Sequence, residues 1–132
     1  MNQSWSDVRP YFDRDVVVHA ATLMPDGAPH SVPVWVGIEG DGIAFFMETG
    51  SRKDKNLAAD PRVAMSVTNP GNPLDMAFIR GRATRRLEGD EAMVIVDRIA
   101  QRYTGRPYSL REGLVVYLVE PDVTWARDHS AG

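Results

Sequence analysis

Cysteine is absent from this 132-residue chain, and its absence excludes several kinds of chemistry. Disulfide bridges, zinc–thiolate sites, iron–sulfur clusters and cysteine nucleophiles all require a thiol. Long apolar runs are missing too, although a membrane-spanning helix needs about 20 consecutive apolar residues. No basic and apolar leader precedes the first predicted helix. We therefore expect a cytoplasmic protein that has no membrane partner.

An excess of basic charge is also missing. The chain carries 15 Lys and Arg against 18 Asp and Glu, which gives a net charge of −3. Nothing global attracts such a chain to nucleic acid, so no nucleic-acid partner is expected. His19, His30 and His129 lie far apart in the sequence and belong to no metal-ligand motif, so we predict no metal site. Walker A, GxGxxG and GxSxG motifs are absent as well.

The chain does contain segments of alternating apolar and polar residues, which are typical of half-buried strands. Glycine, proline and aspartate turns separate them. The pattern predicts one domain over residues 1–132, mainly β (α+β), with six strands in an antiparallel barrel and two or three short peripheral helices. The predicted strands are 16–22, 31–38, 43–49, 63–67, 76–87 and 114–119, with a bulge or bend at Gly81 and the last strand ending at Glu120-Pro121. The predicted helices are 4–15, 51–59 and 90–103, of which the second is stopped by Asp60-Pro61 and the third is terminated at Gly105.

The run Ser51-Arg-Lys-Asp-Lys-Asn-Leu57 carries the most chemical information. Ser51 followed by Asp54 is a capping-box pattern, so Ser51 is the predicted N-cap of a helix. Arg52, Lys53 and Lys55 then occupy the first turn, where each cation opposes the helix dipole by a few tenths to about 1 kcal/mol. A bound phosphate would reverse that sign. The run alone leaves two interpretations open, a solvated basic turn that Asp54 partly neutralises and a phosphate site.

Two further strand positions suggest a binding surface. Trp35 lies opposite the apolar face that Val34 and Val36 present, so we expect it to meet solvent, a partner subunit or a planar ligand. Met76 and Phe78 share a strand face with arginines, a mixture that is typical of an interface or a cleft.

The order of these elements resembles the pyridoxamine-phosphate-oxidase-like split β-barrels, in particular their small flavin- and deazaflavin-dependent oxidoreductases. The resemblance covers roughly Val16 to Val119. It rests on an ordered set of segments rather than on one motif: 19–35, 51–57, 60–67, 79–84 and 90–103.

The resemblance implies a homodimer with two cofactor sites at the subunit interface. By position, the phosphate would be held by the basic turn, and the ring would lie along one strand and be lined by the next. The partner subunit would contribute from the region around residues 74–78. The implied cofactor-binding residues are Pro33, Val34, Trp35, Phe46, Met47, Thr49, Ser51, Arg52, Lys53, Lys55, Asn56, Met76 and Phe78.

Relatives of this kind use FMN or the deazaflavin coenzyme F-420. The compact chain and its Ser-Arg-Lys-Asp-Lys-Asn-Leu turn resemble the F-420 branch more closely, so F-420 is the predicted cofactor and FMN is the alternative. A pyridoxal-phosphate substrate is not expected, because only Arg127 is available after Glu120 where the true oxidase has a basic cluster.

These observations predict an oxidoreductase that transfers hydride from bound F-420 to a small conjugated substrate such as a quinone, an enone or a tetrapyrrole. The alternatives are an FMN-dependent oxidoreductase of the same fold and a non-enzymatic flavin- or haem-binding protein, since a fold does not establish turnover. A purely structural protein with solvated lysines is a third interpretation. The sequence indicates no catalytic acid or base.

Overall fold

The computed structural model describes residues 2–131, which form three helices and seven strands. None of these helices is both long and apolar enough to cross a lipid bilayer. The elements follow one another as α1 (Trp5–Phe12), β1 (Val18–Leu23), β2 (Pro29–Val34), β3 (Val36–Glu39), β4 (Gly42–Glu48), α2 (Arg52–Ala59), β5 (Arg62–Asn69), β6 (Asn72–Leu87), α3 (Gly89–Thr104) and β7 (Leu114–Asp128).

All seven strands belong to one antiparallel sheet with the order β2-β1-β5-β6-β7-β4-β3. The edge strands β2 and β3 are consecutive in the chain and only Trp35 separates them. The sheet must therefore curl so that the end of β2 and the start of β3 come together at Trp35, which makes a split barrel. The predicted class is confirmed, but the predicted count of six strands is wrong.

The extra strand arises because the predicted strand 31–38 is two strands. Its first half pairs with β1 and its second half pairs with β4, at the opposite edge of the sheet. Side-chain alternation continues across Trp35, so the sequence pattern gives no sign of the change of partner.

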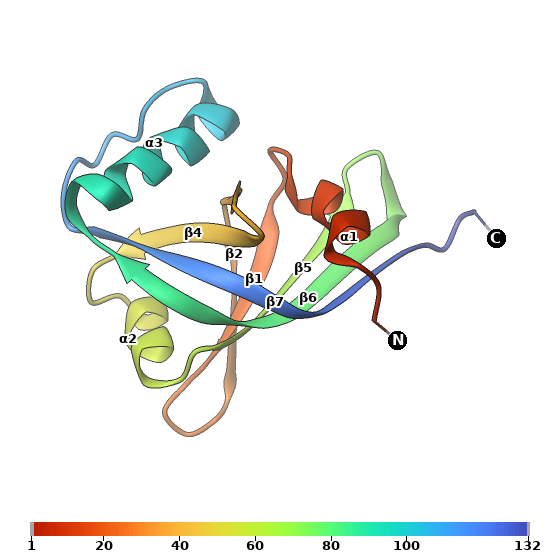
Figure 1. The fold of residues 1–132 in the computed structure, drawn as a ribbon, viewed down its shortest axis with the longest axis horizontal. Helices are drawn as coiled ribbons and strands as arrows, with labels where there is room; N and C mark the ends of the chain where they lie inside the picture. Colours follow the sequence, from red (N-terminus) through yellow and green to blue (C-terminus); the bar gives the residue numbers. More distant parts are fainter. Residues whose placement is uncertain (1, 132) are drawn as a thin grey trace.

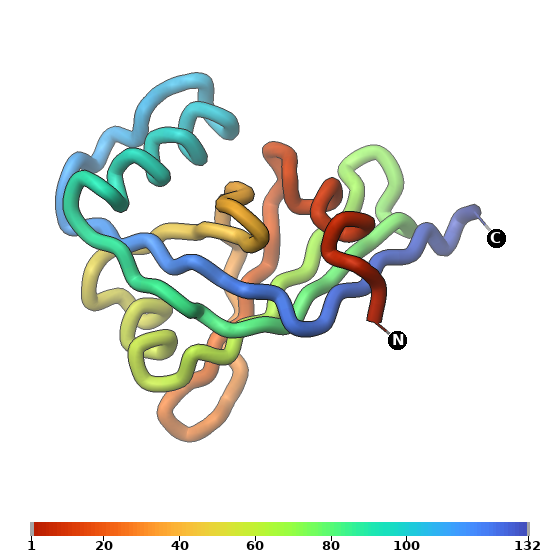
Figure 2. Tube along the Cα trace, viewed as in Figure 1, coloured from red at the N-terminus to blue at the C-terminus, as the bar shows by residue number. Residues whose placement is uncertain are grey.

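The long strands β6 and β7 pair along the length of the molecule (Figure 2). Gly81 was predicted to form a bulge or bend, and the β6–β7 register shifts between Arg80 and Gly81. A Cβ at Gly81 would lie 2.2 Å from the Glu120 carbonyl oxygen, so only glycine fits. Pro121 pairs at this irregularity, and β7 continues to Asp128 instead of ending at Glu120-Pro121 as predicted.

Residues that cap or stop helices mark the observed helix ends. Ser4 and Ser51 cap α1 and α2, and Gly105 ends α3 with a φ of 76° in the left-handed region. Asp60-Pro61 stops α2, as predicted. The first helix ends at Phe12, three residues before its predicted end at Asp15.

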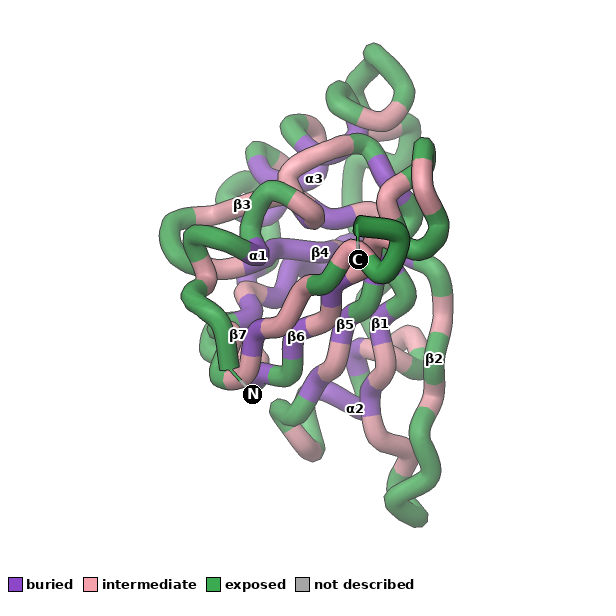
Figure 3. Tube along the Cα trace, turned by 90° about the vertical axis from the view of Figure 1, so that its right-hand side faces the viewer, coloured by how far each residue is buried: buried purple, intermediate pink, exposed green. Residues whose placement is uncertain are grey.

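Two apolar clusters hold the fold together, and burial follows the inner strands (Figure 3). The main cluster fills the curl of the sheet, and α1 inserts Val8 and Phe12 into it. The second cluster lies between the sheet and α3. Helix α2 lies on the other side of the β6–β7 ribbon from α3 (Figure 1), directly after β4.

Candidate cofactor-binding site

The first turn of α2 is the candidate anion-binding element. Ser51 has extended backbone angles, and its Oγ accepts the N–H of Asp54 at 3.4 Å. The predicted N-cap is therefore confirmed. Gly50 precedes it with a φ of +79°, which a glycine adopts without strain. Ser51 also donates its own N–H to the Glu48 carbonyl at 3.1 Å, which ties the turn to the end of β4.

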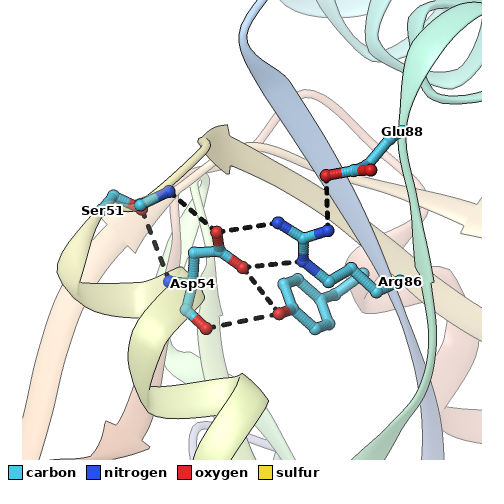
Figure 4. A network of polar contacts seen from close by, with 6 residues as sticks. Ser51, Asp54, Arg86 and Glu88 are labelled. Carbon is cyan, nitrogen blue, oxygen red and sulfur yellow. Dashed lines mark hydrogen bonds and ion pairs between the residues drawn. The ribbon is translucent and has the colours of Figure 1, made fainter.

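Asp54 lies at the centre of a buried polar network beneath this turn (Figure 4). Its side chain is 7% exposed. Arg86 of β6 donates to both carboxylate oxygens, at 2.9 and 3.0 Å. Tyr117 of β7 donates its hydroxyl at 2.7 Å, and Gly50 donates its N–H at 2.8 Å. The carboxylate therefore has partners from β6, from β7 and from the turn that precedes α2.

These partners shift the acid–base equilibria of the network. The hydrogen bonds from Arg86, followed by those from Gly50 and Tyr117, lower the pKa of Asp54 from 3.8 to about 2 in spite of its burial. Burial and the hydrogen bond to Asp54 raise the pKa of Tyr117 from 10.0 to about 12. Asp54 and Glu88 raise the pKa of the Arg86 guanidinium above its ordinary value. At neutral pH the network therefore holds a charged Asp54 and a protonated Tyr117.

This pairing bears on the first interpretation of the basic turn, in which Asp54 partly neutralises the cations. Among residues 2–131, Asp54 forms its ion pair with Arg86 and with no other cation. Arg52, Lys53 and Lys55 form no ion pair with any described carboxylate. Asp54 thus does not neutralise the turn, and three cations remain around the N-terminus of α2. Lys53 and Lys55 are also the two lysines of the whole sequence.

Asn56 is buried and bonds both to β1 and to one cation of the turn. It is 2% exposed, and its side-chain nitrogen donates to the Thr22 Oγ1 of β1 at 3.0 Å. Its side-chain oxygen accepts a long hydrogen bond from Arg52 at 3.5 Å. Asn56 therefore ties α2 to β1 and also holds the Arg52 side chain.

Trp35 lies at the split between β2 and β3 and packs under α3. Its ring stacks on Tyr103 with the centroids 5.0 Å apart, and Phe46 and Tyr108 meet it edge-on at 6.5 and 6.4 Å. The hydroxyl of Tyr103 accepts the N–H of Val36 at 3.1 Å, which secures the start of β3. The expected neighbours of Trp35 did not include the chain's own helix α3, so that prediction was incomplete.

The other predicted ring-lining residues have unequal exposure. Val34 and Met47 are buried in the main core, with 8% and 5% exposure, so only their backbone can face a ligand. Pro33 and Thr49 are exposed. Phe46, beside Trp35, is half-buried on the α3 side of β4.

Met76 and Phe78 lie on the outer face of β6, as their predicted common face requires. The Phe78 ring stacks on Trp125 at 5.3 Å, and the Arg80 guanidinium lies 5.5 Å from the Phe78 centroid. A groove of about 270 Å³ runs beside them and is lined by β1, β5, β6 and β7. Within one chain, this region is separate from the α2 turn, since Phe78 lies eight residues along β6 from Arg86, roughly 25 Å.

Sequence reasoning missed Arg86, Glu88 and Tyr117. The partners Arg86 and Tyr117 lie 32 and 63 residues from Asp54, so no local spacing connects them. Tyr117 did carry a signal, because it is the one hydroxyl in the aliphatic run 114–119 and a buried tyrosine hydroxyl usually finds a partner. Arg86, next to Arg85 in an exposed-looking strand end, carried none.

The fold is a split β-barrel, and the site is a cationic turn at the end of β4 whose Ser51 caps helix α2. A family model for pyridoxamine 5'-phosphate oxidase matches residues 6–126, and the chain belongs to that family. No curated protein sequence matches the chain.

Solved structures agree with this assignment. An F420 reductase is 28% identical with a TM-score of 0.79, and the match covers 89% of this chain and 94% of that one. A conserved hypothetical protein from Mycobacterium tuberculosis is 24% identical with a TM-score of 0.81, over 96% and 86% of the two chains. A heme binding protein from Mycobacterium smegmatis is 21% identical with a TM-score of 0.70, over 99% and 60%. The last two show similarity of fold alone.

Proposed function

We propose that this protein is an oxidoreductase that binds the deazaflavin coenzyme F-420 and transfers hydride to a small conjugated organic substrate, such as a quinone, an enone or a tetrapyrrole. The observation that carries the proposal is the basic turn, whose three cations have no carboxylate partner because Asp54 pairs with Arg86 of β6 instead. The structural similarity to an F420 reductase supports the choice of cofactor. The bound cofactor would supply the hydride. The protein would hold the cofactor and orient the substrate against it.

The residues of the turn fit a phosphate group. The N–H groups of Arg52 and Lys53 have no carbonyl partner within α2, because they belong to its first turn. Together with the side chains of Arg52, Lys53 and Lys55, they form the donor set that a phosphate requires. In this proposal Ser51 caps the helix, and Asn56 holds Arg52 rather than the phosphate.

The ring would lie along the split edge of the barrel. Pro33 and Val34 end β2 there and Trp35 follows them, while Phe46 and Met47 belong to the end of β4 and Thr49 follows that strand into the turn. Val34 and Met47 would contribute backbone groups, because their side chains fill the core. This placement puts the ring and the phosphate on one continuous stretch of chain.

We further propose that the protein is a homodimer with its cofactor sites between the subunits. Phe78 and Met76 lie eight and ten residues from Arg86 along β6, roughly 25 and 33 Å, so they can line the site only if a second copy supplies them. The outer sheet face that carries Phe78, Trp125 and the 56% exposed Val17 offers an apolar surface for such a contact. Sedimentation with and without cofactor tests the dimer.

A side-by-side titration of the purified protein with FMN and F-420, followed by cofactor fluorescence, tests the cofactor. We expect tight binding of F-420, and at least tenfold weaker binding in Lys53→Ala and in Lys55→Ala, about 1.4 kcal/mol each. Arg106→Ala is the matched control, because it removes one exposed cation from the α3–β7 loop. Preference for FMN would keep the site and change the cofactor. Binding of neither would contradict the proposal.

The two lysines allow a second, chemical test. An amine-reactive reagent can label only Lys53, Lys55 and the chain's N-terminus. A phosphate-bearing cofactor in the turn should protect both lysines from labelling, and mass spectrometry of the peptides measures the protection. Labelling that is unaffected by saturating cofactor would place the ligand elsewhere.

Turnover separates an enzyme from a carrier. Steady-state oxidation of the reduced cofactor with quinone, enone and tetrapyrrole acceptors should exceed the rate without protein. Binding without turnover would instead favour a non-enzymatic flavin or haem carrier, and the structural similarity to a heme binding protein is the specific reason to include haem in the titration.

A further inference from the structure

Asp54 is an unexpected residue for an anion-binding turn. It lies between Lys53 and Lys55, and a carboxylate at that place repels the phosphate that the proposed function puts there. A turn selected only for positive charge would have a neutral residue instead. The structure gives a reason for the carboxylate, because its four hydrogen bonds come from Gly50, Arg86 and Tyr117 and none comes from a lysine.

We propose that Asp54 is a positioning residue for the cofactor phosphate: paired with Arg86 of β6 and Tyr117 of β7, it holds the Gly50 amide and so orients the donors of the α2 turn. This inference rests on the proposed function and deepens it. Asp54 does not touch the ligand, and it acts through the backbone that carries Arg52 and Lys53.

The network connects the turn to three strands. Glu48 ends β4 and accepts the N–H of Ser51 at 3.1 Å. Arg86 belongs to β6 and Tyr117 to β7, and both reach the same carboxylate. The hydroxyl of Tyr117 also lies 3.3 Å from the Asp54 backbone carbonyl oxygen. The turn between β4 and α2 is thereby fixed by side chains of β6 and β7 as well as by the elements at its two ends. This reduces the conformational entropy that the turn would lose when a ligand binds.

The network also determines which amide groups remain for a ligand. Asp54 takes the N–H of Gly50, Glu48 takes that of Ser51, and the Ser51 Oγ takes that of Asp54. In the first turn of α2, the N–H groups left without a partner in the chain are those of Arg52 and Lys53. The carboxylate thus directs the ligand to two adjacent donors whose side chains are both cationic.

Neutralising Asp54 distinguishes positioning from simple charge balance, because the two roles predict changes of opposite sign. Asp54→Asn leaves Arg86 without its carboxylate partner and makes the surroundings of the turn more positive by one charge. If Asp54 only balanced charge, phosphate binding would become tighter. If it positions the turn, phosphate binding weakens although the local charge becomes more favourable.

The experiment measures the preference for the phosphate itself. The wild-type protein is titrated with FMN and with riboflavin, which lacks the phosphate, and likewise with F-420 and its chromophore without the phosphate-bearing tail. The ratio of the two dissociation constants is the readout, since a general loss of structure would weaken both ligands alike. The variants are Asp54→Asn, the milder Tyr117→Phe, and the control Asp60→Asn, which removes the same charge from the other end of α2.

We expect the preference for the phosphorylated ligand to fall about tenfold in Asp54→Asn, which corresponds to about 1.4 kcal/mol. It should fall by a smaller factor in Tyr117→Phe and stay within twofold in Asp60→Asn. A preference that rises or does not change in Asp54→Asn overturns the positioning role and leaves the proposed function standing. A wild-type protein that does not prefer the phosphorylated ligand overturns both.

Discussion

The helix α2 carries an aspartate near each end, and each aspartate pairs with an arginine in a different way. Asp54 meets Arg86 from a strand 32 residues further along, with an exposed fraction of 7% for its side chain. Asp60 meets Arg62 only two residues away, and the Arg62 side chain is 74% exposed. Both pairs lower the pKa of the aspartate, mainly through a hydrogen bond from the arginine.

The difference shows that burial and partners, more than residue type, determine what an ion pair does. Water and salt screen the Asp60–Arg62 pair, so we expect it to contribute little. The Asp54 carboxylate is buried, and a tyrosine hydroxyl and a backbone amide bind it in addition to the arginine. Breaking such a pair leaves a buried charge without compensation, so the network can organise a site but is sensitive to the loss of any member.

Removal of Arg86 should produce the largest effect. Arg86→Met leaves the Asp54 charge in a buried position, and we expect the free energy of unfolding to fall by about 3 kcal/mol. Urea unfolding measures the change. Arg62→Met is the control at the exposed pair, and its unfolding midpoint should match that of the wild type. Equal effects from the two substitutions would remove the distinction between the two ends of α2.

The second-largest effect should come from acid, which we expect to weaken the stabilisation by the buried Asp54–Arg86 pair. The folded pKa of Asp54, about 2, is below its ordinary value of 3.8. The stabilisation is therefore complete above about pH 4 and disappears as the pH falls toward 2. It amounts to roughly 2 kcal/mol, which is the pKa difference multiplied by 1.36 kcal/mol per unit. Because other aspartates also titrate, the measurement is the difference in unfolding free energy between the wild type and Asp54→Asn from pH 5 to pH 2. A difference that does not change over this range would contradict the assignment.

The tyrosine hydroxyl should have the smallest of the three effects. Tyr117→Phe removes one hydrogen bond to Asp54 and keeps the ring, so we expect the free energy of unfolding to fall by about 1 kcal/mol. Tyr11 provides the matched comparison, because its hydroxyl also donates to an aspartate, Asp75, at 2.5 Å but in a less buried position. Tyr11→Phe should lose less stability than Tyr117→Phe in the same urea experiment. The reverse order would show that burial does not set the strength of these bonds.

Features that depend on neighbouring residues could be predicted from the sequence. The cap at Ser51, the stop at Asp60-Pro61, the bulge at Gly81 and the end of α3 at Gly105 all lie where local signals placed them. Each depends on one residue's hydrogen-bonding group or backbone freedom, and such properties do not require knowledge of the distant chain.

Features that depend on distant pairing could not be predicted. The strand predicted over 31–38 changes partner at Trp35 without any break in its alternation. Strand β7 passes through Pro121 because Gly81 opposes it across the sheet. Trp35 is covered by α3, which begins more than 50 residues later. In each case the deciding contact joins segments that no sequence window contains.

The candidate site shows the same division. The sequence by itself determined that a capped helix would begin with Arg52, Lys53 and Lys55, because serine, glycine and the charges are all local to that turn. Only the tertiary structure decided what Asp54 does there. Folding brings Arg86 and Tyr117 to the carboxylate and leaves the three cations without an ion-pair partner among the described residues. The physical reason is that a charge is neutralised by whatever lies nearest in space, and the sheet pairing sets those neighbours.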